Sequence, residues 1–426
     1  MADASGHAPP RQLPVRWSLS AHARRLLVLA LAGMILAVVT SRPEFAGLAA
    51  PALMLLSTWR SDRPGQVSVA TRVPSTNVVE GVQTTLRVEI HGQQDYDARL
   101  LIEPAETVMA GDAVTLPSGQ PSRAAALWLT PTRWGRYSLG ILAITFTDRY
   151  RLFEGRALAQ LPHVTCLPEP ARLEQTVVLS RLPSRLGEHP ARAAGDGGEF
   201  AGVREFVPGD RQRRINWAAT TRHGTLHLTT FAAERTQNIV VIADETTDLG
   251  TPGSSTLDLV LRGAAGVVTR YLAARDRVGL IIYAGRLSWI GPSQGRRHYL
   301  RLLDLMISAP GGWEHKSGLT RLPRAALPPG ALILVFSPLL DPRLVEAIRD
   351  LRERGFSVLV VDVLNAEPTH DTSRLSRLTA RTWRLEQQAV RFSLTQIGVP
   401  IVHWDGTSSL DEPLAPYTRR VLVAAR

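Results

Sequence analysis

Two apolar runs lie close to the amino terminus, at residues 26–39 and 45–56, and neither contains a charged residue. Each is shorter than the roughly 20 residues that an upright helix needs to cross a bilayer. Arginines precede the first run and follow the second, at positions 16, 24, 25, 60 and 63. Because arginine-rich flanks stay in the cytoplasm, we expect a transmembrane helical hairpin at residues 24–60, after a polar tail at 1–23. Both termini and the large soluble part would then be cytoplasmic, at the plasma membrane.

Two alternatives compete with this anchor. The pair Arg24-Arg25 before a short apolar run is typical of a twin-arginine or Sec signal, which would place the remaining chain outside the cytoplasm. A buried hairpin of a soluble protein is the second alternative. The second apolar run favours the membrane hairpin, because a cleaved signal does not need one.

The pattern changes to a period of two between residues 66 and 168. Alternating or β-branched segments are separated by turn-forming clusters, and they lie at residues 67–73, 84–90, 99–102, 124–129 and 137–146. Several short strands at this spacing predict an antiparallel β-sandwich of immunoglobulin or fibronectin type at residues 61–170. Cys166 lies in its last strand-like stretch, where we interpret it as a small buried hydrophobe.

Apolar strands alternate with amphipathic helices over residues 237–426. Strand-like runs occur at 239–243, 278–283, 332–336, 358–363 and 401–404. Ser255 with Asp258 predicts a capping box before one helix, Asp341 with Pro342 predicts the start of another, and residues 414–425 are also expected to be helical. This repetition requires a doubly wound, mainly parallel α/β sheet. Residues 171–236 form the linker between the sandwich and this domain.

The loop after the first strand of this domain is the main candidate site. Ligands of such sheets bind at the carboxyl ends of the strands, and there Asp244, Thr246 and Asp248 alternate with other residues. Three hard oxygen ligands on one turn suit Mg²⁺ or Ca²⁺. The competing interpretation is that these residues are ordinary caps and turn formers.

Composition narrows the function classes. With 44% hydrophobic and 20% charged residues the chain is globular, and a single cysteine excludes a disulfide framework or a cysteine-rich metal site. The net charge is +11, and Lys316 is the only lysine among its basic residues. This surplus favours an anionic contact such as phospholipid, nucleic acid or an acidic protein.

The linker holds the least generic stretch of the sequence. Its residues either form an ion-pair latch onto the next domain or contribute to a binding site, and they supply no nucleophile–base pair. We call the following residues the signature: Glu199, Phe200, Gly202, Arg204, Glu205, Phe206, Pro208, Gly209, Asp210, Arg214, Ile215, Asn216 and Trp217.

This signature resembles that of the bacterial family called domain of unknown function 58. The resemblance implies a membrane-anchored protein with a von Willebrand factor A-like domain, which acts as an adaptor for MoxR-type AAA+ ATPases in chaperone-like complex assembly or in the cell envelope. It also implies a metal-ion-dependent adhesion site at Asp244, Thr246 and Asp248, with Thr320 as a weaker fourth ligand. Asn216 stands where the family usually has Asp, and Ser337-Pro338 where it often has Ser-Asp.

The sequence therefore favours a non-enzymatic interaction protein without catalytic residues. A metal-dependent hydrolase that uses Asp244 and Asp248 is the first alternative, but the sequence contains no H-E-x-x-H, G-x-S-x-G or P-loop motif. The second alternative is an arginine-rich protein that binds nucleic acid or anionic lipid. The sequence contains no recognised nucleic-acid-binding motif.

Overall fold

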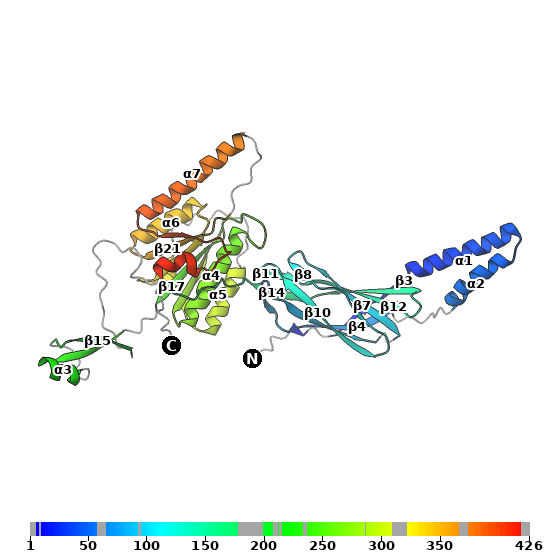
Figure 1. Cartoon of the computed structure of the whole chain (residues 1–426), viewed down its shortest axis with the longest axis horizontal. Helices are drawn as coiled ribbons and strands as arrows, with labels where there is room; N and C mark the ends of the chain where they lie inside the picture. The colour runs from blue at the N-terminus through cyan, green and yellow to red at the C-terminus, as the bar shows by residue number, and fades with distance from the viewer. Residues whose placement is uncertain are drawn as a thin grey trace. The chain divides into compact units, whose positions relative to one another are not determined.

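The structure is a computed structural model that describes residues 6–7, 10–57, 65–92, 95–177, 199–207, 212, 215–232, 237–285, 287–308, 322–365 and 374–418. The chain divides into two compact units, Met1–Glu169 and Pro170–Arg426. The fold is mixed α/β: an apolar amino-terminal helix and antiparallel sheets belong to the first unit, and a mostly parallel sheet with helices belongs to the second (Figure 1).

Two apolar helices follow the first strands, α1 (Ala21–Thr40) and α2 (Glu44–Ser57). Only α1 is long and apolar enough to cross a membrane among the described helices. The two helices meet through small residues, since Ala30 and Ala49 are buried between them, as is common where helices pack in lipid. The large apolar side chains of α1 point outward. Between Leu27 and Val39, the exposed ones have exposed fractions of 42% to 77%. This exposure disfavours a buried soluble hairpin, because a soluble core helix would cover those side chains.

Three sheets build the rest of the first unit. One has the order β1-β4-β6-β10-β8 with β2 also on β4, a second β3-β13-β12-β7-β9, and a third β11-β14-β5. The strands are β1 (Gly6–His7), β2 (Arg11–Pro14), β3 (Arg16–Leu19), β4 (Gln66–Val73), β5 (Asn77–Val79), β6 (Thr84–His91), β7 (Tyr96–Pro104), β8 (Val108–Ala110), β9 (Val114–Leu116), β10 (Ser122–Pro131), β11 (Gly135–Ser138), β12 (Gly140–Asp148), β13 (Phe153–Gln160) and β14 (His163–Leu167).

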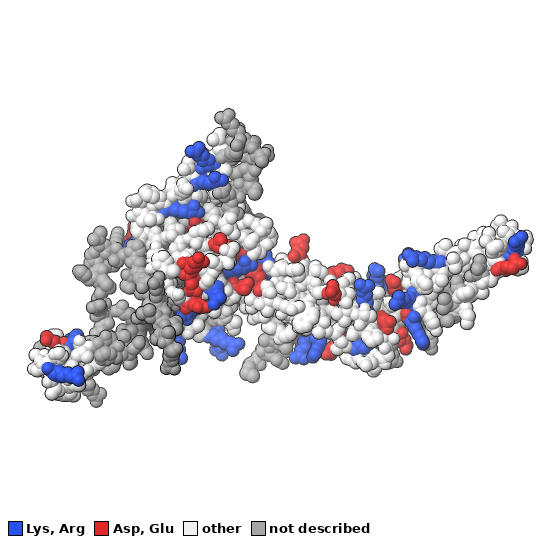
Figure 2. Space-filling model, viewed as in Figure 1, with Lys and Arg blue, Asp and Glu red and all other residues white. Residues whose placement is uncertain are grey.

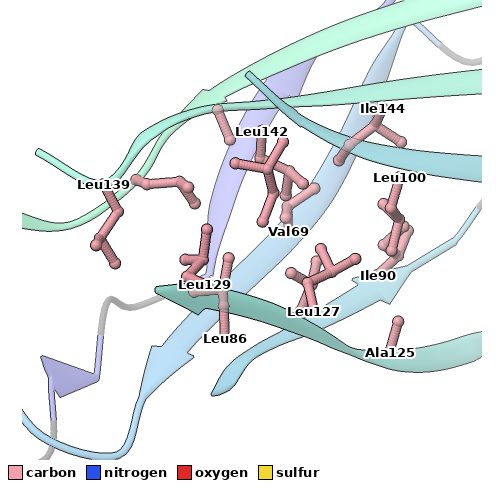
Figure 3. Packing of buried hydrophobic residues seen from close by; sticks show 14 of the residues in the cluster. Val69, Leu86, Ile90, Leu100, Ala125, Leu127, Leu129, Leu139, Leu142 and Ile144 are labelled. Atoms are coloured by element: carbon pink, nitrogen blue, oxygen red, sulfur yellow. The ribbon is translucent and has the colours of Figure 1, made fainter. Parts of the chain in front are cut away.

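The two larger sheets share one apolar core. Alternate residues of β4, β6 and β10 meet alternate residues of β7, β12 and β13, and Figure 3 shows side chains such as Leu86, Leu127 and Leu142 between the strands. The alternation of buried and exposed positions along β10 is the pattern that one buried sheet face requires. Cys166 is buried, and burial raises the pKa of its thiol to about 11, which confirms its interpretation as a hydrophobe.

Two features of this unit differ from the sequence prediction. The expected polar tail at 1–23 contributes β2 and β3, which pair with β4 and β13. The strand expected at 137–146 is interrupted, because Gly140 has a φ of +117° and starts a new strand in another sheet. A pattern of alternation cannot show that a chain changes sheets.

The signature belongs to a small element of the second unit. Strands β15 (Glu199–Glu205) and β16 (His227–Ala232) pair antiparallel, and the short helix α3 (Trp217–His223) lies between them in sequence. His223 is the last residue of α3.

A six-stranded sheet of order β19-β18-β17-β20-β21-β22 forms the body of the second unit, and only β19 runs antiparallel to its neighbour. Its strands are β17 (Asn238–Asp244), β18 (Arg277–Tyr283), β19 (Ser288–Ser293), β20 (Leu332–Ser337), β21 (Ser357–Asp362) and β22 (Ile401–His403). The helices are α4 (Thr256–Ala273), α5 (Arg296–Ser308), α6 (Pro342–Glu353), α7 (Arg374–Gln396) and α8 (Asp411–Leu414), with single 3₁₀ turns at Arg324–Ala326 and Ala415–Tyr417.

Helices cover both faces of this sheet. Val335 packs with Leu344 and Ile348 of α6, whereas the ring of Phe336, the next residue, lies against Gly263 of α4. Successive strand residues point to opposite faces, so α4 and α6 lie on opposite sides. The predicted Ser255–Asp258 capping box and the Asp341 cap are both present. The helix expected at 414–425 does not continue past Leu414, the last residue of α8, in its described part; a 3₁₀ turn and a bridge from Thr418 to Val177 follow.

Candidate functional site

The strand order reverses between β17 and β20. From β17 the chain proceeds through α4 to β18 on one side, and later continues from β20 through α6 to β21 on the other. At such a position the loops diverge to opposite faces, and sheets of this kind commonly bind ligands there. Asp244 ends β17 and Ser337 ends β20, so the predicted loop occupies this switch point.

Asp244 is the centre of a polar cluster at this point. Its carboxylate is fully buried and accepts a hydrogen bond from the Ser337 hydroxyl over 2.5 Å. The backbone N–H and the hydroxyl of Thr246 donate to its other oxygen, at 3.1 Å and 2.6 Å. Burial raises the pKa of Asp244, although these three hydrogen bonds oppose the shift by stabilising the charged form. The cluster therefore joins two neighbouring strands through one carboxylate.

Glu245 is the least satisfied polar group of the site. Its side chain is 6% exposed, and neither carboxyl oxygen has a hydrogen-bond partner in the structure. Burial, together with the neighbouring Asp244, raises the pKa of Glu245 to about 8. The group is therefore mostly protonated at neutral pH, because ionisation in an apolar environment is costly.

The loop that follows is held in place by the start of α4. The buried carboxylate of Asp258 accepts hydrogen bonds from the backbone N–H of Gly253 and of Ser255, at 2.7 Å and 3.1 Å. The hydroxyl of Thr256 donates to Thr247 O and accepts from Leu249 N. Four residues of the loop are thus fixed before any partner binds, which lowers the ordering cost of binding.

A second charged pair lies at the same edge of the sheet. Asp341 caps α6, and Arg343 binds its carboxylate with two guanidinium nitrogens, the closer at 2.8 Å. Asp341 adds to the raised pKa of Asp244, so the two carboxylates are electrostatically coupled. The switch point consequently combines the hydroxyls of Thr246 and Ser337, the carboxyl groups of Asp244, Glu245 and Asp341, and the guanidinium of Arg343.

The predicted metal ligands are only partly brought together. Asp244 and Thr246 are in contact, whereas Asp248 is an exposed residue further along the loop and Thr320 lies outside the described residues. Over the described part of the chain no group of three or more His, Cys, Asp or Glu side chains converges as a metal site would. Oxygen atoms of Asp244, Thr246 and Ser337 match the preference of Mg²⁺ or Ca²⁺ in kind, but they include a single carboxylate, so the metal site stays a prediction.

Ser337 was not among the predicted ligands. The sequence analysis named Ser337 only in the pair Ser337-Pro338, which stands where the resembled family often has Ser-Asp. Nothing in the apolar run 332–336 before it says which strand lies beside it. The pairing of Ala243 with Phe336 places Ser337 next to Asp244, and that pairing is a property of the tertiary fold.

The signature residues have mainly local roles where they are described. Asn216 caps α3, accepting from Ala219 N at 3.0 Å and donating to the Thr229 hydroxyl at 3.2 Å. Trp217 is 68% exposed, which the sequence did not indicate. Glu199, Phe200, Gly202, Arg204 and Glu205 lie in β15, followed by Phe206, and Ile215 bridges to Leu228. Pro208, Gly209, Asp210 and Arg214 lie outside the described residues, so the predicted ion-pair latch stays untested.

A cavity of about 700 Å³ lies at the far end of the same sheet edge. Asp362 and His403, which end β21 and β22, form one wall, and Trp383, Gln387 and Arg391 of α7 form the other. Arg391 donates to Asp362 at 2.6 Å, and the buried Gln387 Oε1 has no partner. The polar wall of this cavity contains one tightly bound ion pair, between Arg391 and Asp362, and its residues do not indicate a specific reaction.

Comparison with known proteins gives a family without an assigned activity. Residues 202–373 match the model of the family described as "Protein of unknown function DUF58". Uncharacterized proteins of Mycobacterium bovis and of two Mycobacterium tuberculosis strains are each 30% identical over 132 residues, which is 30% of this chain and 42% of each relative. The chain thus spans less than half the length of these curated relatives. The resemblance drawn from the signature is confirmed, and residues 202–373 of this chain belong to the DUF58 family.

Proposed function

We propose that this protein is a membrane-anchored, non-enzymatic adaptor that binds a MoxR-type AAA+ ATPase through the loop Asp244–Asp248. The observation that carries the proposal is the cluster at the switch point, where Asp244 is held by Ser337 and Thr246 at the carboxyl edge of a parallel sheet. Such an edge is where sheets of this kind bind their ligands. The cluster itself is buried, and it fixes the start of a loop whose Asp248 is exposed and can meet a partner.

The finer architecture is part of the same proposal. The two larger sheets of the first unit form a sandwich of immunoglobulin or fibronectin type, and the sheet of the second unit is a von Willebrand factor A-like domain. α1 and α2 form the membrane hairpin, with both termini and the soluble units in the cytoplasm. The exposed apolar surface of α1 supports an anchor, and it suits an uncleaved signal equally well.

A divalent cation would be held by oxygen atoms of Asp244, Thr246 and Ser337, and it would supply an open coordination position for a partner carboxylate. Asp244 would supply the negative charge. The hydroxyls of Thr246 and Ser337 donate their hydrogens to it, which directs their lone pairs away from the carboxylate.

Substitutions in the loop test the partner contact. The full chain in detergent is incubated with a purified MoxR-type ATPase, and capture is measured with Mg²⁺ or with a chelator. Asp244→Asn and Asp248→Asn are each expected to weaken capture at least tenfold, which corresponds to about 1.4 kcal/mol. Asp405→Asn is the matched control, because Asp405 is an exposed residue after β22 whose carboxylate accepts hydrogen bonds from the nearby Thr407.

Folding must be separated from binding in this test. Asp244 is buried, so circular dichroism and thermal unfolding of each variant accompany the capture assay, and the exposed Asp248 serves as the variant that leaves the core intact. Wild-type capture by both Asp248→Asn and Thr246→Ala would show that the partner does not bind this loop. If capture is equal with Mg²⁺ and with chelator, the loop remains the proposed contact, and the metal ion takes no part in it.

A further inference from the structure

Helix α7 carries an exposed apolar stripe. Leu378, Leu385 and Phe392 are 58%, 57% and 65% exposed. They are seven residues apart, so they return to almost the same side of the helix after each two turns. Gln387 and Leu394, on the opposite side, are buried against the domain, so the stripe faces away from it. In Figure 1 α7 lies beside α6 and its amino-terminal half extends beyond the sheet.

Arginines accompany the stripe. The helix contains five arginines, at 374, 377, 381, 384 and 391, and one acidic residue, Glu386. Basic side chains follow α7 in Figure 2. Arg391 is bound to Asp362 and turns toward the sheet, but Arg381 lies within a turn of Leu378 and Leu385 on the exposed side. The surface thus combines a narrow apolar line with positive charge beside it.

A second helix is a poor occupant of this surface. A helix pair needs apolar residues at two positions of each heptad. On one side of the stripe the second position is filled by Arg381, Gln388 and Thr395, and on the other side by Thr382, Ala389 and Gln396. One apolar row with the exposed Arg381 beside it instead suits the boundary between lipid headgroups and acyl chains, where apolar side chains insert shallowly and arginines bind phosphates.

We propose that α7 docks on the surface of an anionic lipid bilayer, with Leu378, Leu385 and Phe392 inserted and Arg381 on the headgroups. This inference rests on the anchoring part of the proposed function, because α1 with its exposed apolar surface would hold the chain at a membrane. It adds a second membrane contact, made by the domain that also carries the Asp244 loop. Docking therefore fixes the side of this domain that remains open to a protein.

The test uses the full chain in vesicles of phosphatidylcholine alone or mixed with phosphatidylglycerol. Leu385→Cys is labelled with an environment-sensitive fluorophore, and the labelling of wild type reports any reaction of the buried Cys166. The label is expected to shift to the blue and to be quenched by spin-labelled lipid only in the anionic vesicles, and less so at high salt. Leu300→Cys on α5, where the leucine is 45% exposed, is the matched control and should not respond.

Charge is tested in the same preparation. Arg381→Gln is expected to lower the ratio of inserted to free label about fivefold, the effect of one basic residue near an anionic surface. An equal response in neutral and anionic vesicles, or no response, overturns the inference. A response in detergent that grows with protein concentration identifies a second copy as the occupant, and a response that requires the ATPase identifies that protein; either result also overturns it.

Flotation of the vesicles separates this inference from the anchor. If the chain does not float with neutral vesicles, the anchoring part of the proposed function is wrong. The response of the position-385 label to added anionic vesicles then decides the docking of α7 independently. If the chain floats and this label stays silent, the anchor stands and α7 does not dock.

Discussion

Glu245→Gln is expected to stabilise the protein at neutral pH. The pKa of Glu245 is raised to about 8, mainly by burial, whereas in the unfolded chain it is about 4.3. Between these two pKa values, Glu245 keeps its proton in the folded protein and releases it in the unfolded chain. The contribution of Glu245 to the free energy of unfolding therefore falls as the pH rises from about 4 toward 8. Glutamine carries no charge and avoids this loss. The expected gain in the free energy of unfolding is about 3–4 kcal/mol at pH 7 and close to zero at pH 4.

The measurement is denaturant unfolding of wild type and variant at several pH values between 4 and 9. The difference between the two proteins isolates Glu245, because all other titrating groups are shared. Glu412→Gln is the matched control, since Glu412 is exposed, and it should leave the stability unchanged at every pH. A difference between wild type and Glu245→Gln that stays constant with pH would mean that Glu245 is ionised in the folded protein.

Gly140→Ala is expected to destabilise the first unit by about 3–5 kcal/mol. Gly140 has a φ of +117°, which alanine rarely adopts. An added Cβ would lie 2.3 Å from the Glu103 carbonyl oxygen and 2.9 Å from Pro104 Cα. Both contacts are to backbone of the paired strand β7, so no side chain can move to relieve them.

Hydrogen exchange of the full chain locates this effect. Amides of β12 should lose protection, and those of β17 and β20 should keep theirs, because the two units have separate cores. Gly92→Ala is a graded control: its φ is +87° but nothing lies within 4 Å of the added Cβ, so about 1–2 kcal/mol is expected from backbone strain alone. Equal losses for Gly92→Ala and Gly140→Ala would exclude the steric contribution.

The local sequence pattern correctly predicted the elements that depend on interactions between neighbouring residues. The alternation at residues 67–73 and 84–90 became β4 and β6, and the capping residues Ser255, Asp258 and Asp341 start the helices that they predict. A strand with one buried face must alternate, and a helix start needs side-chain acceptors for its free N–H groups. The signature likewise identified the family, because it is a property of residue order.

The sequence also predicted where the site lies, but it did not predict which residues contact each other there. Asp244 ends an apolar run, so its place at the carboxyl edge of a parallel sheet could be predicted. The neighbour that holds it, Ser337, is 93 residues away in the chain, and only the pairing of β17 with β20 brings the two together. The exposure of Trp217 and of the α7 stripe is likewise decided by which faces the remaining elements cover.

The sequence by itself determined the capped helices α4 and α6, most strands, the family and the candidate loop of this protein, since spacing and residue type act over a few neighbouring residues. Tertiary structure alone decided that the chain changes sheets at Gly140, that Glu245 is enclosed without a partner and that Asp244 bonds across two strands. The physical reason is that burial and electrostatic environment depend on contacts between residues far apart in the chain. The pattern along one segment carries no record of those contacts.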